Sequence, residues 1–111
     1  SLGDSAEDSP DGLTKMFEHI HAHARFYRVM LSQNGDPAFG ERIRRYIDKR
    51  LRSVLPAAQR SQPLTELYLS FIVSGSVGVF GWWLEHSMPY TPAEMATISQ
   101  QLASVILNNP R

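Results

Sequence analysis

The chain has 111 residues, which suffices for one domain with a modest hydrophobic core. Eleven basic residues balance eleven acidic ones. This neutrality disfavours a free-standing nucleic-acid binder, because such proteins usually carry a basic surplus. The absence of cysteine excludes disulfides, thiolate zinc sites and cysteine nucleophiles.

Residues 1–9 are expected to form a flexible N-terminal linker. They read SLGDSAEDS, which is acidic and polar and lacks the basic start and apolar run of a secretory signal. An opening of this kind suggests a piece of a longer protein. The helical domain itself is expected over residues 10–111.

The first predicted helix runs from about Pro10 to Leu31, with Ser9 as its cap and Pro10 at its first position. Apolar residues recur along it at three- and four-residue spacing and so share one face. They are Leu13, Met16, Phe17, Ile20, Ala24, Tyr27 and Leu31. Arg25 and Arg28 could pair with an anionic ligand, but solvation explains them better.

The segment 32–37 is predicted to break the helix. Asn34-Gly35 favours left-handed backbone, and Asp36-Pro37 can cap and start a second helix, from about Pro37 to Leu55. Its buried face is predicted to contain Phe39, Ile43, Tyr46, Ile47, Arg50 and Leu51. Six of the eleven basic residues lie between positions 42 and 52, and a solvated helix face explains them better than a nucleic-acid site.

After a predicted loop over 56–62, the third helix is expected over 64–86. No charged residue occurs between Leu67 and Leu84, and small residues recur at 70, 74 and 78, a spacing that lets two helices approach closely. The fourth helix is predicted to start at Thr91-Pro92, where Thr91 and Glu94 have the spacing of a capping box.

Three interpretations compete for the apolar third helix. It has the minimum length for a transmembrane span, but the other helices are amphipathic and it carries several serines and glycines. It can be buried inside one monomer, although a domain of this size rarely covers a whole helix. We favour burial partly by its own domain and partly by a second copy.

The predicted fold is therefore all-α, an antiparallel bundle of about four to five helices. The last two helices would form a hairpin that pairs with the same hairpin of a second copy, making an intersubunit four-helix bundle. The predicted dimer interface contains Trp83, Leu84, Met88, Met95, Ile98, Leu102, Val105 and Ile106.

Several segments carry a resemblance to a known family. They are Glu18-His19-Ile20, Phe26-Tyr27, Leu31, Asn34 to Phe39, Phe71 to Gly75, Trp82 to His86 and Met88 to Met95. Together they resemble the C-terminal effector-binding and dimerisation domain of TetR-type transcriptional regulators, over about residues 13–107. The tryptophan pair, the proline turn and the capping box are the most specific part.

The resemblance implies a cytoplasmic homodimer through the last two helices, with a small-molecule pocket among the others. In the complete family architecture an N-terminal helix-turn-helix domain binds an operator. That domain is absent from these 111 residues, so operator DNA is expected to be a partner of a parent protein only. Ligand binding would shift the population of DNA-binding conformations.

Pocket candidates are aromatic and apolar side chains on faces not claimed by packing, with one histidine as a polar contact. They are Phe17, His21, Tyr27, Tyr68, Phe71, Ile72 and Trp82. Each can also be plain core. The expected ligand is a small apolar or aromatic molecule.

No metal site or cofactor is expected. His19 and His23 have the spacing of a helical metal site, but ordinary exposed histidines explain them better. Catalysis is not expected either, since no nucleophile elbow or phosphate-binding loop is found. The alternative function is a helical adaptor or assembly module that binds another protein without a small-molecule ligand.

Overall fold

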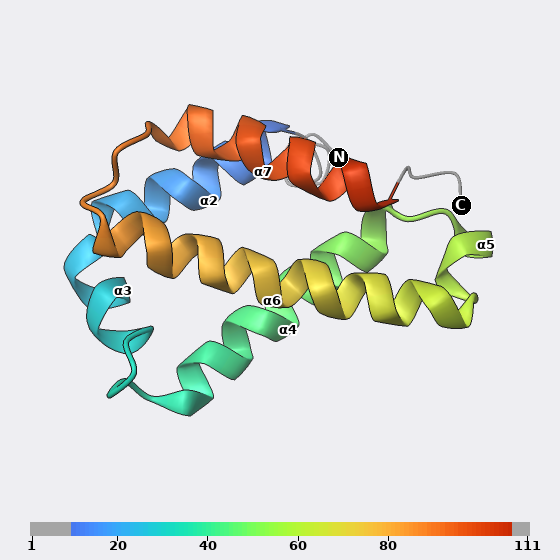
Figure 1. The fold of residues 1–111 in the computed structure, drawn as a ribbon, viewed down its shortest axis with the longest axis horizontal. Coiled ribbons are helices and arrows are strands. Elements are labelled where there is room, and N and C mark those ends of the chain that lie inside the picture. The colour runs from blue at the N-terminus through green and yellow to red at the C-terminus, as the bar shows by residue number, and fades with distance from the viewer. Residues whose placement is uncertain (1–9, 108–111) are drawn as a thin grey trace.

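The computed structural model describes residues 10–107, and within that range it contains six helices and no strand (Figure 1). The predicted all-helical fold is confirmed. The helices are α2 (Pro10–Ala22), α3 (Ala24–Met30), α4 (Pro37–Val54), α5 (Ala57–Arg60), α6 (Pro63–Glu85) and α7 (Pro92–Leu107). The predicted linker over 1–9 and the Ser9 cap lie outside the described residues.

The first predicted helix is two helices, because the chain turns at His23 (φ −119°, ψ 37°). The turn lets α3 leave α2 and pack against α6. There the Arg28 guanidinium donates two hydrogen bonds, of 3.2 and 3.1 Å, to the Leu84 carbonyl oxygen. Arg28 was expected to be solvated. It instead binds the last turn of α6, where the helix dipole favours a cation.

Two predicted helix starts are confirmed by their capping bonds. The Asp36 carboxylate accepts a 2.9 Å bond from the Ala38 amide at the start of α4. At α7 the Glu94 amide donates to the Thr91 hydroxyl (3.1 Å) and the Thr91 amide donates to the Glu94 carboxylate (2.8 Å). This reciprocal pair is the capping box that the sequence predicted.

Left-handed backbone occurs at a different turn from the one predicted. Among the described glycines none has a positive φ, whereas Ser87 (φ 62°) and Met88 (φ 51°) do. Glycine is required at position 35 because of close packing and not because of left-handed backbone. A Cβ there would lie 2.6 Å from the Val29 carbonyl oxygen and would also collide with the Met30 carbonyl, so the backbone packs too closely for any side chain.

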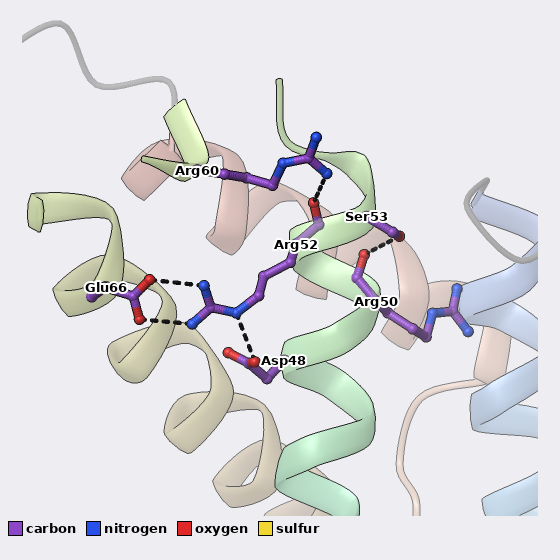
Figure 2. A network of polar contacts seen from close by, with 6 residues as sticks. All are labelled: Asp48, Arg50, Arg52, Ser53, Arg60 and Glu66. Atoms are coloured by element: carbon purple, nitrogen blue, oxygen red, sulfur yellow. Dashed lines mark hydrogen bonds and ion pairs between the residues drawn. The ribbon is translucent and has the colours of Figure 1, made fainter. Parts of the chain in front are cut away.

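The segment 56–62, predicted as a loop, contains the short helix α5. The buried Thr65 at the start of α6 fixes it by donating a 2.6 Å hydrogen bond to the Gln59 carbonyl oxygen. Beside it, Arg52 of α4 donates to both carboxylate oxygens of Glu66 on α6 (2.8 and 2.7 Å) and to Asp48 (2.8 Å), as Figure 2 shows. These bonds join α4 to the first turn of α6.

The core lies where α2, α6 and α7 meet. Phe17 of α2 is fully buried and makes edge-to-face contacts, both at 5.3 Å between ring centroids, with Phe80 and Trp83 of α6. This geometry is favourable for aromatic rings beyond the area that they bury. The predicted stripe of the first helix is confirmed, since all seven of its members belong to the core or pack against it.

Helix α6 runs through the middle of the molecule, and α7 returns in the opposite direction after the turn (Figure 1). The last two helices are antiparallel, as predicted, but they have little contact with each other (Figure 1). Helix α7 packs mainly against α2, and α6 packs mainly against α4. The two last helices therefore diverge from their shared turn, which leaves space between them.

Candidate functional site

The first of two cavities has a volume of about 600 Å³ and is lined by α2, α3, α4 and α6. This size is within the range that holds a drug-sized ligand. Its lining residues are Gly12, Lys15, Met16, His19, Ile20, Tyr27, Leu31, Ile43, Tyr46, Arg50 and Phe80. The cavity is thus mostly apolar, with a few polar groups that can orient a ligand.

The polar groups of this first cavity are cationic or hydrogen-bond donating. Lys15, His19 and Arg50 line it together with two tyrosines, and no carboxylate does. Arg50 donates a 3.1 Å hydrogen bond to the Tyr46 hydroxyl. Burial, and secondarily the neighbouring Tyr46, raise the pKa of the Tyr27 phenol above its usual value, so Tyr27 keeps its proton.

The second cavity, of about 460 Å³, lies between the diverging helices α6 and α7 and extends to α2 and α4. Its lining includes Leu13, Phe17, Ile47, Leu51, Phe71, Ile72, Gly75, Val79, Leu102, Ala103, Val105 and Ile106. Three residues, Met16, Arg50 and Phe80, line both cavities and form the wall between them.

The structure divides the predicted ligand residues into three groups. Tyr27 lines the first cavity. Phe17, Phe71 and Ile72 line the second cavity, and of these Phe17 and Ile72 are buried core residues.

The remaining three predicted ligand residues, His21, Tyr68 and Trp82, line neither cavity. His21 is exposed, with its ring 6.2 Å from that of the buried Trp83. Trp82 is exposed and stacks on His86, with ring centroids 4.4 Å apart. We therefore leave His21, Tyr68 and Trp82 out of the proposed ligand site.

Sequence reasoning missed Arg50, Tyr46 and Lys15 as cavity residues. A signal for Arg50 was present, because it is a charged residue inside the apolar stripe predicted for α4. A cation at such a position must reach a partner, solvent or a cavity. Lys15 and Tyr46 carried no comparable signal.

The predicted interface residues fall into two groups, those that are buried and those that retain surface. Trp83, Leu84 and Met95 are buried inside the chain, so they offer no surface to a second copy. Trp83 also donates a 2.9 Å hydrogen bond from its indole nitrogen to the Tyr90 carbonyl oxygen, which fixes the turn before α7. All three belong to the hydrophobic core of the chain, where Trp83 meets Phe17 of α2.

The other predicted interface residues retain surface. Met88, Ile98 and Ile106 are half-buried, and Leu102 and Val105 of α7 are 55% and 70% exposed. On α6, Leu67 (63%) and Phe71 (68%) are equally exposed but were not predicted. Phe71, Leu102 and Val105 border the same second cavity, so these surfaces are continuous.

We call this surface the α6–α7 face. At 100° per residue its α6 members lie on one side of the helix. The face consists of Leu67, Phe71, Ser74, Gly78, Leu102 and Val105. The side chains at 74 and 78 are small, and the Ser74 hydroxyl accepts a 2.9 Å hydrogen bond from Arg44 of α4.

Helix α6 is also long and apolar enough to cross a membrane, judged by length and composition alone, and it is the one such helix in the described range. Core helices of soluble proteins pass the same test. In this chain Leu69, Ile72, Val73, Phe80 and Leu84 of α6 are buried against other helices. One side of α6 therefore has the packing of a core helix.

The histidine pair does not extend into a metal site within the part of the chain that the structure describes. The rings of His19 and His23 lie 4.6 Å apart, but no third histidine, cysteine or carboxylate joins them. His19 instead contacts the Tyr27 ring edge-on at 5.6 Å and lines the first cavity.

The described helices surround two partly open cavities and leave an apolar face on α6 and α7. A family model described as a transcriptional regulator C-terminal region, of the TetR type, matches residues 7–105. The chain belongs to this family, which confirms the resemblance found in the sequence. No curated protein and no solved structure matches the chain significantly.

Proposed function

We propose that this domain senses a small molecule and dimerises within a TetR-type transcriptional regulator of the cytoplasm. The ligand binds in the first cavity, and a second copy covers the α6–α7 face. Operator DNA is bound by another domain of the parent protein. The observation that carries the proposal is the 600 Å³ cavity, which shares a wall with the space beneath that face.

Support for the second copy comes from the chemistry of the face. Leu67, Phe71, Leu102 and Val105 are all more than half exposed and lie on the last two helices. An apolar patch of this kind is unusual on a monomer and typical of an interface. In a two-fold arrangement the same patch meets itself, so each copy covers the other.

Support for ligand sensing comes from the shared wall. A ligand in the first cavity contacts Met16, Arg50 and Phe80, which also line the second cavity beneath the dimer face. Helix α2 carries Met16 and packs against α7. Ligand binding can therefore favour one packing of α2 against α7 and so one arrangement of the dimer.

The dimer is tested by light scattering after size-exclusion chromatography without detergent. We expect a mass near twice 12.5 kDa for the wild type. Leu67→Glu should give a monomer, because a carboxylate cannot be buried unpaired in an apolar interface. Val29→Glu is the matched control, since Val29 of α3 is 61% exposed, much like Leu67 at 63%.

The outcomes separate the proposed function from its alternative. A wild-type monomer would contradict the dimer and would favour an adaptor that offers the α6–α7 face to a different protein. A dimer that persists in Leu67→Glu but dissociates in Val29→Glu would place the interface elsewhere. Insolubility without detergent would contradict the cytoplasmic assignment.

A further inference from the structure

The first cavity carries a positive charge that nothing in the described part of the chain neutralises. Arg44 and Arg45 pair with Glu41, and Arg52 pairs with Asp48 and Glu66. Arg50 lies on the same helix but has no carboxylate partner among residues 10–107. Figure 2 shows its side chain pointing away from the Arg52 network, toward α2.

We propose that the first cavity binds an organic monoanion with an apolar body, of which a carboxylic acid is the simplest case, and that Arg50 binds its anionic group. This inference rests on the ligand-sensing function proposed above. It adds the chemical class of the ligand and the residue that recognises it.

The charge of the lining selects an anion. Lys15, His19 and Arg50 line the first cavity and no acidic residue lines either cavity, although the whole chain has no net charge. The positive lining is therefore a local property of the site. A cationic ligand would be repelled by this lining, and an anionic ligand would gain charge-assisted hydrogen bonds from Arg50.

The position of Arg50 selects a terminal anionic group. Its guanidinium donates to the Tyr46 hydroxyl at 3.1 Å and lies over that ring, 5.7 Å from the centroid, so Tyr46 orients it. A guanidinium has several donors in a planar array, and a carboxylate accepts two of them at once. The bond to Tyr46 leaves other donors of Arg50 available for such a group.

The rest of the lining selects an apolar body. Met16, Ile20, Leu31, Ile43 and Phe80 enclose the remaining space. Met16 is long and unbranched and stands in the wall between the two cavities, so it can adapt to ligands of different shape.

The test compares decanoate with decanol, two probes that share a chain and differ in charge, by calorimetric titration of the full chain. We expect decanoate to bind about tenfold more tightly, because its hydrogen bonds to Arg50 are charge-assisted. Arg50→Met should remove this preference, because it should weaken decanoate binding more than decanol binding. Arg45→Met is the matched control, since Arg45 lies on α4 and lines neither cavity.

Two further measurements keep the result interpretable. Arg50→Lys retains the charge without the planar donors and should keep part of the preference. Added salt should weaken decanoate binding to the wild type and leave decanol binding unaffected.

Equal affinity of the two probes for the wild type would overturn the anion inference alone, as would a preference that survives in Arg50→Met. If neither probe binds, the cavity does not admit an apolar body. That result would overturn the proposed ligand sensing together with the inference.

Discussion

Ser87 occupies the position where a helix end most favours glycine. The Met88 amide donates to the Trp83 carbonyl (2.7 Å) and the Ser87 amide donates to the Leu84 carbonyl (3.2 Å), which is the hydrogen-bond pattern of a Schellman motif closing α6. Ser87 is its left-handed residue, with φ 62°. A side chain in this conformation is strained, and Met88 follows it into the half-buried position beside the core.

Ser87→Gly should therefore stabilise the protein by about 0.5–1 kcal/mol, since relief of the left-handed strain outweighs the added freedom of the unfolded chain. Urea unfolding measures the change as a higher midpoint. Ser70→Gly is the matched control, because Ser70 is an exposed residue inside α6, and there glycine should lower the midpoint. A fall in stability for Ser87→Gly would contradict the strain at this turn.

Replacing glycine with alanine is expected to have opposite effects on stability at Gly35 and at Gly40. Gly35→Ala should destabilise the protein by about 1–3 kcal/mol, because the new Cβ meets backbone carbonyls that cannot move aside. Gly40→Ala should gain about 0.5 kcal/mol, because Gly40 lies in α4 with no atom near its added Cβ. Thermal unfolding followed by circular dichroism measures both, and equal effects of the two changes would contradict this assignment.

The sequence predicted local features at the residue scale and missed those set by packing. The Asp36 cap and the Thr91–Glu94 capping box depend on residues within three positions of one another, so spacing alone reveals them. Gly35 was assigned to left-handed backbone, because the close approach of the Val29 carbonyl is a contact that no pattern in the sequence encodes.

At the scale of elements, Arg52 joins α4 to α6 through Glu66. The hydrogen bonds from Arg52 hold the pKa of the Glu66 carboxyl below its usual value of 4.5 in the folded chain. The folded-state pKa is the lower one, so the stabilisation is fully present above the pKa of the unfolded chain. It is lost as the pH falls through the folded-state value.

Glu66→Gln should therefore lower the melting temperature slightly at neutral pH and have a smaller effect in acid. The decrease at neutral pH should be small, because the Glu66 side chain is 57% exposed and that of Arg52 is 36% exposed, and it should shrink further with added salt. Melting curves of wild type and variant across the acidic range measure the difference. A difference that stays constant with pH would show that Glu66 acts through packing and not through its charge.

Helix α6 shows why the sequence could not tell which of two neighbouring residues is buried in the core. Trp82 and Trp83 are adjacent, but Trp83 is buried in the core while Trp82 is exposed. Because α6 is apolar nearly all round, its periodicity does not reveal which side faces the core. The turn at His23 was missed for a related reason, since the apolar stripe continues through it into α3.

At the scale of the whole molecule, the divergence of α6 and α7 shapes the second cavity and the α6–α7 face. Helix α7 packs on α2 and not along α6, so the second cavity opens between α6 and α7 and their outer side chains remain exposed. The all-helical fold could be predicted, because the first two predicted helices carry apolar stripes and α4 and α7 begin with side-chain caps. The cavities could not, because they depend on crossing geometry between helices far apart in sequence.

If a second copy covers the α6–α7 face, folding and association are linked, and the melting temperature must depend on protein concentration. A hundredfold rise in concentration should raise it by about 5–10 °C for a dimer of this size. Leu67→Glu should melt lower and lose this dependence, whereas Val29→Glu should keep it, since Val29 lies on α3 outside the face. Melting by circular dichroism at both concentrations measures the dependence. A wild-type melting temperature that does not change with concentration would show that each copy folds without the other. The exposed Leu67 and Phe71 would then lie on the surface of a stable monomer.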